Sequence, residues 1–89
     1  MDEYSLEFDE EWDTYFSKLD KSMQNRVWKK VQQLKRRIAS RHLKEGLPFF
    51  VSVIGQYRLC YSIDEKRKIK TIYFVGNHKE YEKWVGIRL

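Results

Sequence analysis

Two side chains in the C-terminal half of this chain are candidates for a functional site. Arg58 alternates along the chain with Tyr57, Leu59 and Tyr61, so in a strand it projects from the face opposite to these apolar neighbours. His78 follows a Gly-Asn pair, and an imidazole there could accept or donate a proton near neutral pH. The simpler alternative is a surface arginine and a loop histidine bonded to backbone.

Two aromatic residues follow His78 at helical spacing. Tyr81 and Trp84 recur every three residues, which places them on one side of a helical segment with the histidine. An exposed ring beside basic residues can stack on a nucleotide base, an interaction worth about 1–3 kcal/mol. The alternative for Trp84 is that it closes one end of the core.

A third group of candidates lies in the middle of the chain, where Arg41, His42 and Lys44 could contact phosphates as exposed cations. The basic run at residues 66–68 is more simply a solvated turn. No metal or cofactor is expected, because two histidines and one cysteine lack ligand-like spacing and four scattered glycines form no nucleotide fingerprint. The carboxylates crowd near the N-terminus, which argues against a carboxylate pair in a site built on Arg58.

The composition indicates a single small domain, residues 1–89, with an uneven charge distribution. Eight acids and one lysine give residues 1–20 a net charge of −7, whereas seventeen bases and five acids give residues 21–89 a net charge of +12. A polyanionic partner would relieve this repulsion, although a merely solvated basic surface is the alternative. The lone Cys60 is typical of a reducing cytosol. No apolar stretch is long enough for a membrane span.

The elements that would position these residues follow from periodicity. Residues 4–8 alternate as a strand, and Asp9 is a candidate N-cap for a helix with an apolar stripe at Trp12, Tyr15, Phe16 and Leu19. A second helix, capped by Asp20 or Ser22, carries a stripe formed by Met23, Val27, Val31, Leu34 and Ile38. A basic loop at 40–48 leads to strands at 49–54, 56–63 and 69–75, and residues 78–84 form one or two helical turns.

These elements predict an α+β fold with the order β-α-α-β-β-β and a short C-terminal helical turn. The sheet is small and antiparallel-rich, with a two-helix hairpin on one face. Its other face stays partly open, and the functional residues are expected there.

This element order and two sequence segments resemble those of the RelE/ParE toxin superfamily of type II toxin–antitoxin systems. One is the run Gly55-Gln56-Tyr57-Arg58-Leu59-Cys60-Tyr61, which is similar to the family's Gly-Asp-Tyr-Arg-x-x-Tyr segment. The other is Gly76-Asn77-His78-Lys79-Glu80-Tyr81, which is similar to the Gly-Thr-His-x-x-Tyr ending of several members. The resemblance extends over nearly the whole chain.

The resemblance implies a toxin that is neutralised by a cognate antitoxin. RelE-like members cleave mRNA on the ribosome through attack of the RNA 2′-hydroxyl, without a metal, whereas ParE-like members inhibit DNA gyrase. Carried over by motif, Arg58 would stabilise the phosphate, His78 would be the acid or base, and Tyr81 or Trp84 would orient or stack the substrate. No membrane association is implied.

The sequence departs from the RelE-like pattern on the strand before the Tyr-Arg motif. RelE-like enzymes often carry two basic residues there, and Val51 and Val53 occupy the corresponding outward positions. His42 or Lys44 would have to substitute for the base. The departure favours two alternatives, a ParE-like gyrase inhibitor or a degenerate member that only binds antitoxin.

Overall fold

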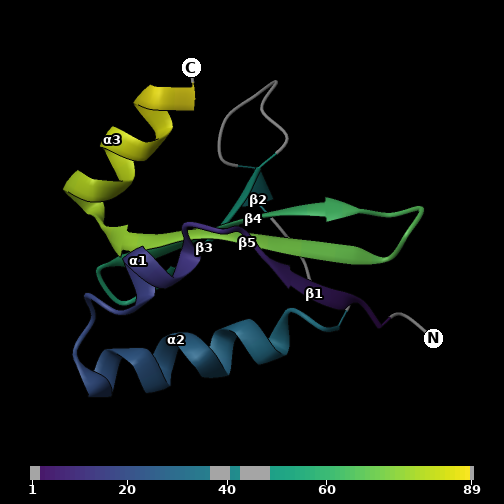
Figure 1. Ribbon diagram of the computed structural model, residues 1–89, viewed down its shortest axis with the longest axis horizontal. Helices are drawn as coiled ribbons and strands as arrows, with labels where there is room; N and C mark the ends of the chain where they lie inside the picture. Colours follow the sequence, from purple (N-terminus) through teal and green to yellow (C-terminus); the bar gives the residue numbers. More distant parts are fainter. Residues whose placement is uncertain (1–2, 37–40, 43–48, 89) are drawn as a thin grey trace.

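The computed structural model describes residues 3–36, 41–42 and 49–88, which form one mixed sheet with helices on both of its faces (Figure 1). In chain order the elements are β1 (Ser5–Phe8), α1 (Trp12–Phe16), α2 (Lys21–Gln33), β2 (Arg41–His42), β3 (Phe50–Ile54), β4 (Tyr57–Asp64), β5 (Ile69–Asn77) and α3 (His78–Arg88). The predicted α+β class is confirmed. No helix within the described ranges is long and apolar enough to cross a membrane.

The sheet is mostly antiparallel, as expected, with strand order β1-β5-β4-β3-β2. β2 to β5 pair antiparallel with their sheet neighbours, whereas β1 runs parallel to β5. The predicted loop at 40–48 is wrong at two positions, because Arg41 and His42 form β2 and pair with β3 at the sheet edge. The register between β4 and β5 shifts after Cys60: Cys60 pairs with Phe74 and Tyr61 with Ile72, so Tyr73 of β5 is skipped.

One face of the sheet packs on α1 and α2 through the main core. Val27, Val31 and Leu34 of the α2 stripe are fully buried against Leu59 and Ile72 of the sheet. Ile38, predicted as the last residue of this stripe, lies outside the described residues.

The two predicted helix N-caps have different outcomes. Asp20 is the N-cap of α2, since its carboxylate accepts a hydrogen bond from the Met23 amide at 2.8 Å. The Asp9 cap is wrong, because α1 begins later, with Glu11 at the N-cap position and no side-chain cap. Asp9 instead accepts a hydrogen bond from the Glu11 amide at 3.1 Å, so it stabilises the turn that precedes the helix.

A buried lysine joins the end of α2 to the sheet. Lys70 on β5 is only 1 % exposed, and its Nζ donates a hydrogen bond to the Arg36 carbonyl at 2.9 Å. The ammonium also lies 4.4 Å from the centroid of the Tyr4 ring. A lysine at an inward strand position contradicts simple apolar alternation, so the sequence pattern alone missed this contact.

The second face of the sheet is less open than predicted, because α3 is an eleven-residue helix rather than one or two turns. Trp84 and Val85 of α3 pack on Cys60 and Phe74 in a second apolar cluster. Among the described residues, an open space remains at the end of the sheet where the β3–β4 turn and β4 meet the start of α3.

Gly76 sets the angle at which α3 leaves β5. A Cβ at this position would lie 2.6 Å from Cζ of Phe74 and 2.9 Å from Oε1 of Glu80. Both distances are shorter than a van der Waals contact, so a larger residue must displace the Phe74 ring and the Glu80 side chain.

We predict that Gly76→Ala lowers the free energy of unfolding by about 1–3 kcal/mol through this overpacking. Gly86→Ala is the matched control on α3, since a Cβ there meets nothing within 4 Å. Replacing an exposed helical glycine by alanine should stabilise the protein by up to about 1 kcal/mol. Urea denaturation of the two variants measures both effects, and equal stabilities would contradict the steric argument.

Candidate functional site

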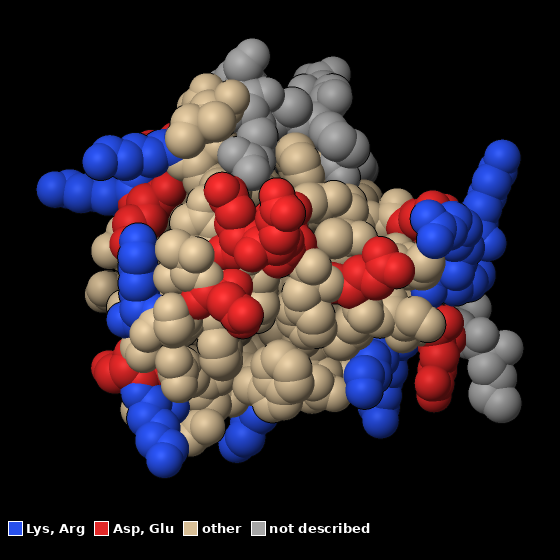
Figure 2. All heavy atoms as spheres, in the orientation of Figure 1, with Lys and Arg blue, Asp and Glu red and all other residues tan. Residues whose placement is uncertain are grey.

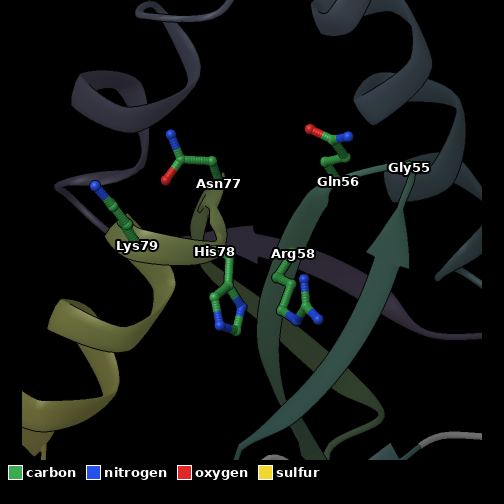
Figure 3. A pocket seen from close by; sticks show the side chains of 6 residues that line it. All are labelled: Gly55, Gln56, Arg58, Asn77, His78 and Lys79. Atoms are coloured by element: carbon green, nitrogen blue, oxygen red, sulfur yellow. The ribbon is translucent and has the colours of Figure 1, made fainter.

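A shallow pocket of about 440 Å³ opens at the uncovered end of the sheet. It is lined by the β3–β4 turn, the start of β4 and the β5–α3 junction, through Gly55, Gln56, Arg58, Asn77, His78 and Lys79 (Figure 3). Arg58 and His78 project to the same side of this pocket, whereas Gln56 and Asn77 project to the other. Two residues that are twenty positions apart in the sequence thus face one space.

The strand register explains the position of Arg58. It pairs with Gly76 on β5 and with Val53 on β3, so neither flanking position carries a polar side chain. Arg58 lies on the same face of β4 as Cys60, as predicted. Cys60 is fully buried under α3, however, and only the arginine reaches the pocket.

His78 is held at the first position of α3 by a reciprocal cap. The Asn77 amide donates a hydrogen bond to Oε1 of Glu80, and the Glu80 amide donates one to Oδ1 of Asn77, both at 2.9 Å. This is the capping-box arrangement with asparagine at the N-cap. The Asn77-x-x-Glu80 spacing is the sequence signal that could have predicted this cap.

The positive charge of the pocket comes from several sources. Arg58 and Lys79 contribute side-chain charges, and the N-terminus of α3 adds the positive end of its dipole. Acidic side chains gather on the face over β1 and α1 shown in Figure 2, while Glu80 and Glu82 of α3 lie near the pocket. An anionic group is therefore favoured at the pocket.

Tyr81 lies between the two candidate catalytic residues. The Arg58 guanidinium carbon lies 5.3 Å from the centroid of the Tyr81 ring, and the His78 ring stacks on the same tyrosine with centroids 6.4 Å apart. Because a ring face attracts a guanidinium, this contact orients Arg58. The three predicted catalytic residues are therefore adjacent.

The protonation state of Tyr81 follows from its surroundings. Partial burial raises the pKa of its phenol above 10.0, Cys60 and Glu82 raise it further, and the Arg58 charge lowers it. At neutral pH the hydroxyl is therefore a neutral donor and cannot serve as a base.

Glu82 is the nearest acidic partner of the histidine. Nε2 of His78 lies 3.5 Å from Oε2 of Glu82, one helical turn further along α3. Both side chains are more than 60 % exposed, so this contact can orient the imidazole but contributes little to stability.

The predicted substrate-binding residues have different outcomes. Trp84 is 2 % exposed and stacks on Phe74 at 5.3 Å, so it closes the core and is not available to stack a base. The backbone of Arg41 pairs with Val51, two positions along β3 from the Val53–Arg58 pair. Lys44 lies outside the described residues.

Gln56, Asn77 and Lys79 line the pocket and were not predicted from the sequence.

The two valines on β3 differ in surroundings. Val53, paired directly with Arg58, is 53 % exposed, whereas Val51 is half-buried against the second cluster. The outward position nearest the pocket is thus apolar and open to solvent.

The fold is that of RelE toxins. A chain of the toxin–antitoxin complex RelBE2 from Mycobacterium tuberculosis matches with a TM-score of 0.77 and 23% identity, covering 88% of this chain and 94% of that one. The isolated E. coli RelE toxin matches at 0.70 and 22%, covering 97% and 99%. The RelE–RelB complex of Pyrococcus horikoshii matches at 0.68 and 17%, covering 83% and 93%. No family model and no curated protein matches the sequence.

We predict that Arg58→Gln raises the pKa of Tyr81 further. The guanidinium favours the phenolate, so its removal leaves burial and the acidic neighbours unopposed. The measurement is an ultraviolet titration of phenolate absorbance, taken as the difference from Tyr81→Phe in each background. An unchanged or lower pKa in Arg58→Gln would contradict the Arg58–Tyr81 contact.

Proposed function

We propose that this chain is the toxin of a type II toxin–antitoxin system and that it cleaves mRNA on the ribosome. The observation that carries the proposal is the convergence of Arg58 and His78 on one basic pocket of a RelE fold, with Tyr81 in contact with both side chains. The cognate antitoxin is the expected protein partner, since several similar structures are RelE–RelB complexes. The ribosome and mRNA are the proposed targets.

The proposed reaction is a transesterification at one phosphate of the RNA. The 2′-hydroxyl oxygen attacks the adjacent phosphorus, its proton leaves to a base, and the bond to the 5′-oxygen breaks with protonation of that oxygen. The products are a 2′,3′-cyclic phosphate and a 5′-hydroxyl, so no oxidant or cofactor enters the balance. The phosphorane carries more negative charge than the starting diester, and catalysis requires that this charge be offset.

Each residue has a role that suits its position. The Arg58 guanidinium can offset the phosphorane charge with two parallel hydrogen bonds. His78 can exchange a proton with the 2′- or 5′-oxygen, and general acid–base catalysis of this kind contributes about 10²–10⁴-fold. Neutral Tyr81 keeps the guanidinium oriented and offers a hydroxyl donor, and Lys79 adds charge at the rim.

Val53 favours a second candidate function. The position paired with Arg58 carries an exposed apolar side chain, where a second basic group would assist cleavage. An exposed apolar residue beside an arginine suits protein contact, which is what a ParE-like gyrase inhibitor or a degenerate toxin that binds only antitoxin would need.

We predict that His78→Ala lowers the rate of mRNA cleavage by about 10²-fold or more, and that Arg58→Ala does so to a similar extent. The measurement is induction of the chain in growing cells, with protein synthesis followed by amino-acid incorporation and mRNA ends mapped over time. Lys66→Ala is the control, since this exposed lysine lies in the β4–β5 turn at the opposite end of both strands.

Three results would decide among the candidates. Normal cleavage by His78→Ala would overturn its assigned role. Intact mRNA with DNA damage and filamentation would indicate gyrase inhibition. Unimpaired growth without any antitoxin would indicate the degenerate toxin.

A further inference from the structure

A second basic groove adjoins the pocket on the other side of the β3–β4 turn. Its cations come from α2, through Arg26, Lys29 and Lys30, and it has a volume of about 340 Å³. Gln33 adds an amide one turn further along the helix, and Val53 lies on the sheet side. Arg26 and Lys29 are exposed and Lys30 is half-buried. None of the three forms a salt bridge in the part of the chain that the structure describes.

The groove is continuous with the Arg58–His78 pocket. Gly55 lines both of them, and it occupies the tip of the turn with a positive φ of 60°. A Cβ at Gly55 would lie 3.2 Å from Nη2 of Arg26, so the guanidinium rests against the turn. Gly55, which has no side chain, therefore lies where the Arg58 pocket meets the Arg26 groove.

The α2 cations also flank the position that lacks a basic residue. Val53 lines the groove and pairs with Arg58, so it lies between the strand arginine and the helix cations. Positive charge that β3 does not supply at this point is therefore supplied by α2, from the other side of the Gly55 turn.

We propose that Arg26, Lys29 and Lys30 form a backbone subsite for RNA phosphates that flank the group held at Arg58. The proposal rests on the proposed function for the RNA, because it assigns the flanking part of the same substrate. The lining favours RNA over an acidic protein segment, because protein segments bind mainly through large buried anchor side chains and, among the described residues that line this groove, Val53 alone is an exposed apolar side chain. Cations on a flexible stem contact phosphates regardless of base sequence.

The test compares two double variants that remove equal charge. Arg26→Gln/Lys29→Gln removes two groove cations and keeps good helix formers on α2. Lys66→Gln/Arg67→Gln removes two exposed cations from the distant β4–β5 turn. The probe is a fluorescent 2′-O-methyl oligonucleotide, which cannot be cleaved, used as a dinucleotide and as a strand of about 12 nucleotides. Anisotropy gives the Kd of each protein over a range of salt concentrations.

The groove variant should bind the longer strand at least about 5-fold more weakly and show a smaller salt dependence. Two lost phosphate contacts should reduce the slope of log K against log salt by about 1.4. Its affinity for the dinucleotide should be unchanged, and the turn variant should match the wild type. Equal binding of the long strand by the groove and turn variants would overturn the subsite. So would a loss of affinity for a polyglutamate peptide that equals the loss for RNA, because the occupant would then be an acidic protein.

The two proposals fail in different ways. Wild-type protein that binds the long strand through the groove, yet leaves mRNA intact in cells, would retain the subsite and refute cleavage. Wild-type protein that cleaves mRNA, with a groove variant that binds normally, would refute the subsite and retain cleavage.

Discussion

The junction between β5 and α3 is the constraint on which the site depends. Gly76 allows the helix to start against Phe74, and the reciprocal Asn77–Glu80 hydrogen bonds fix the direction of its first turn. His78 and Tyr81 are one turn apart on this helix, so their distance from Arg58 is set by the same junction. The packing of Trp84 on Phe74 holds the second half of α3 against the sheet. The same helix therefore contributes to the aromatic core and positions the pocket residue His78.

Sequence periodicity predicted the parts of the structure that depend on alternation and helical spacing. The apolar residues around Arg58 assigned its face of β4 correctly, and Asp20 marked the start of α2. The pattern did not predict the buried Lys70, since its partner is a carbonyl at the end of α2, far away in the sequence. Nor did it decide the placement of Trp84, because a residue at helical spacing can face either a core or solvent until the length and angle of the helix are known.

Charge is separated along the chain and also in space. The acidic N-terminal residues lie over β1 and α1, while the pocket cations come from β4, α2 and α3. This arrangement gives an approaching polyanion one favourable side and one unfavourable side. The net charge alone could not reveal such a direction, because it sums two regions of opposite sign.

The missing basic residue at Val53 affects binding and catalysis differently. Attraction of a phosphate tolerates displacement of a cation by a few ångströms, so α2 side chains can replace a strand lysine for affinity. Proton transfer is stricter, because an acid or base must come within about 2.6–3.2 Å of the atom that it serves. A helix on the far side of the Gly55 turn meets the first requirement but not the second. If the chain cleaves RNA, His78 therefore carries the acid–base chemistry of this pocket, with Tyr81 protonated and Arg58 permanently charged beside it.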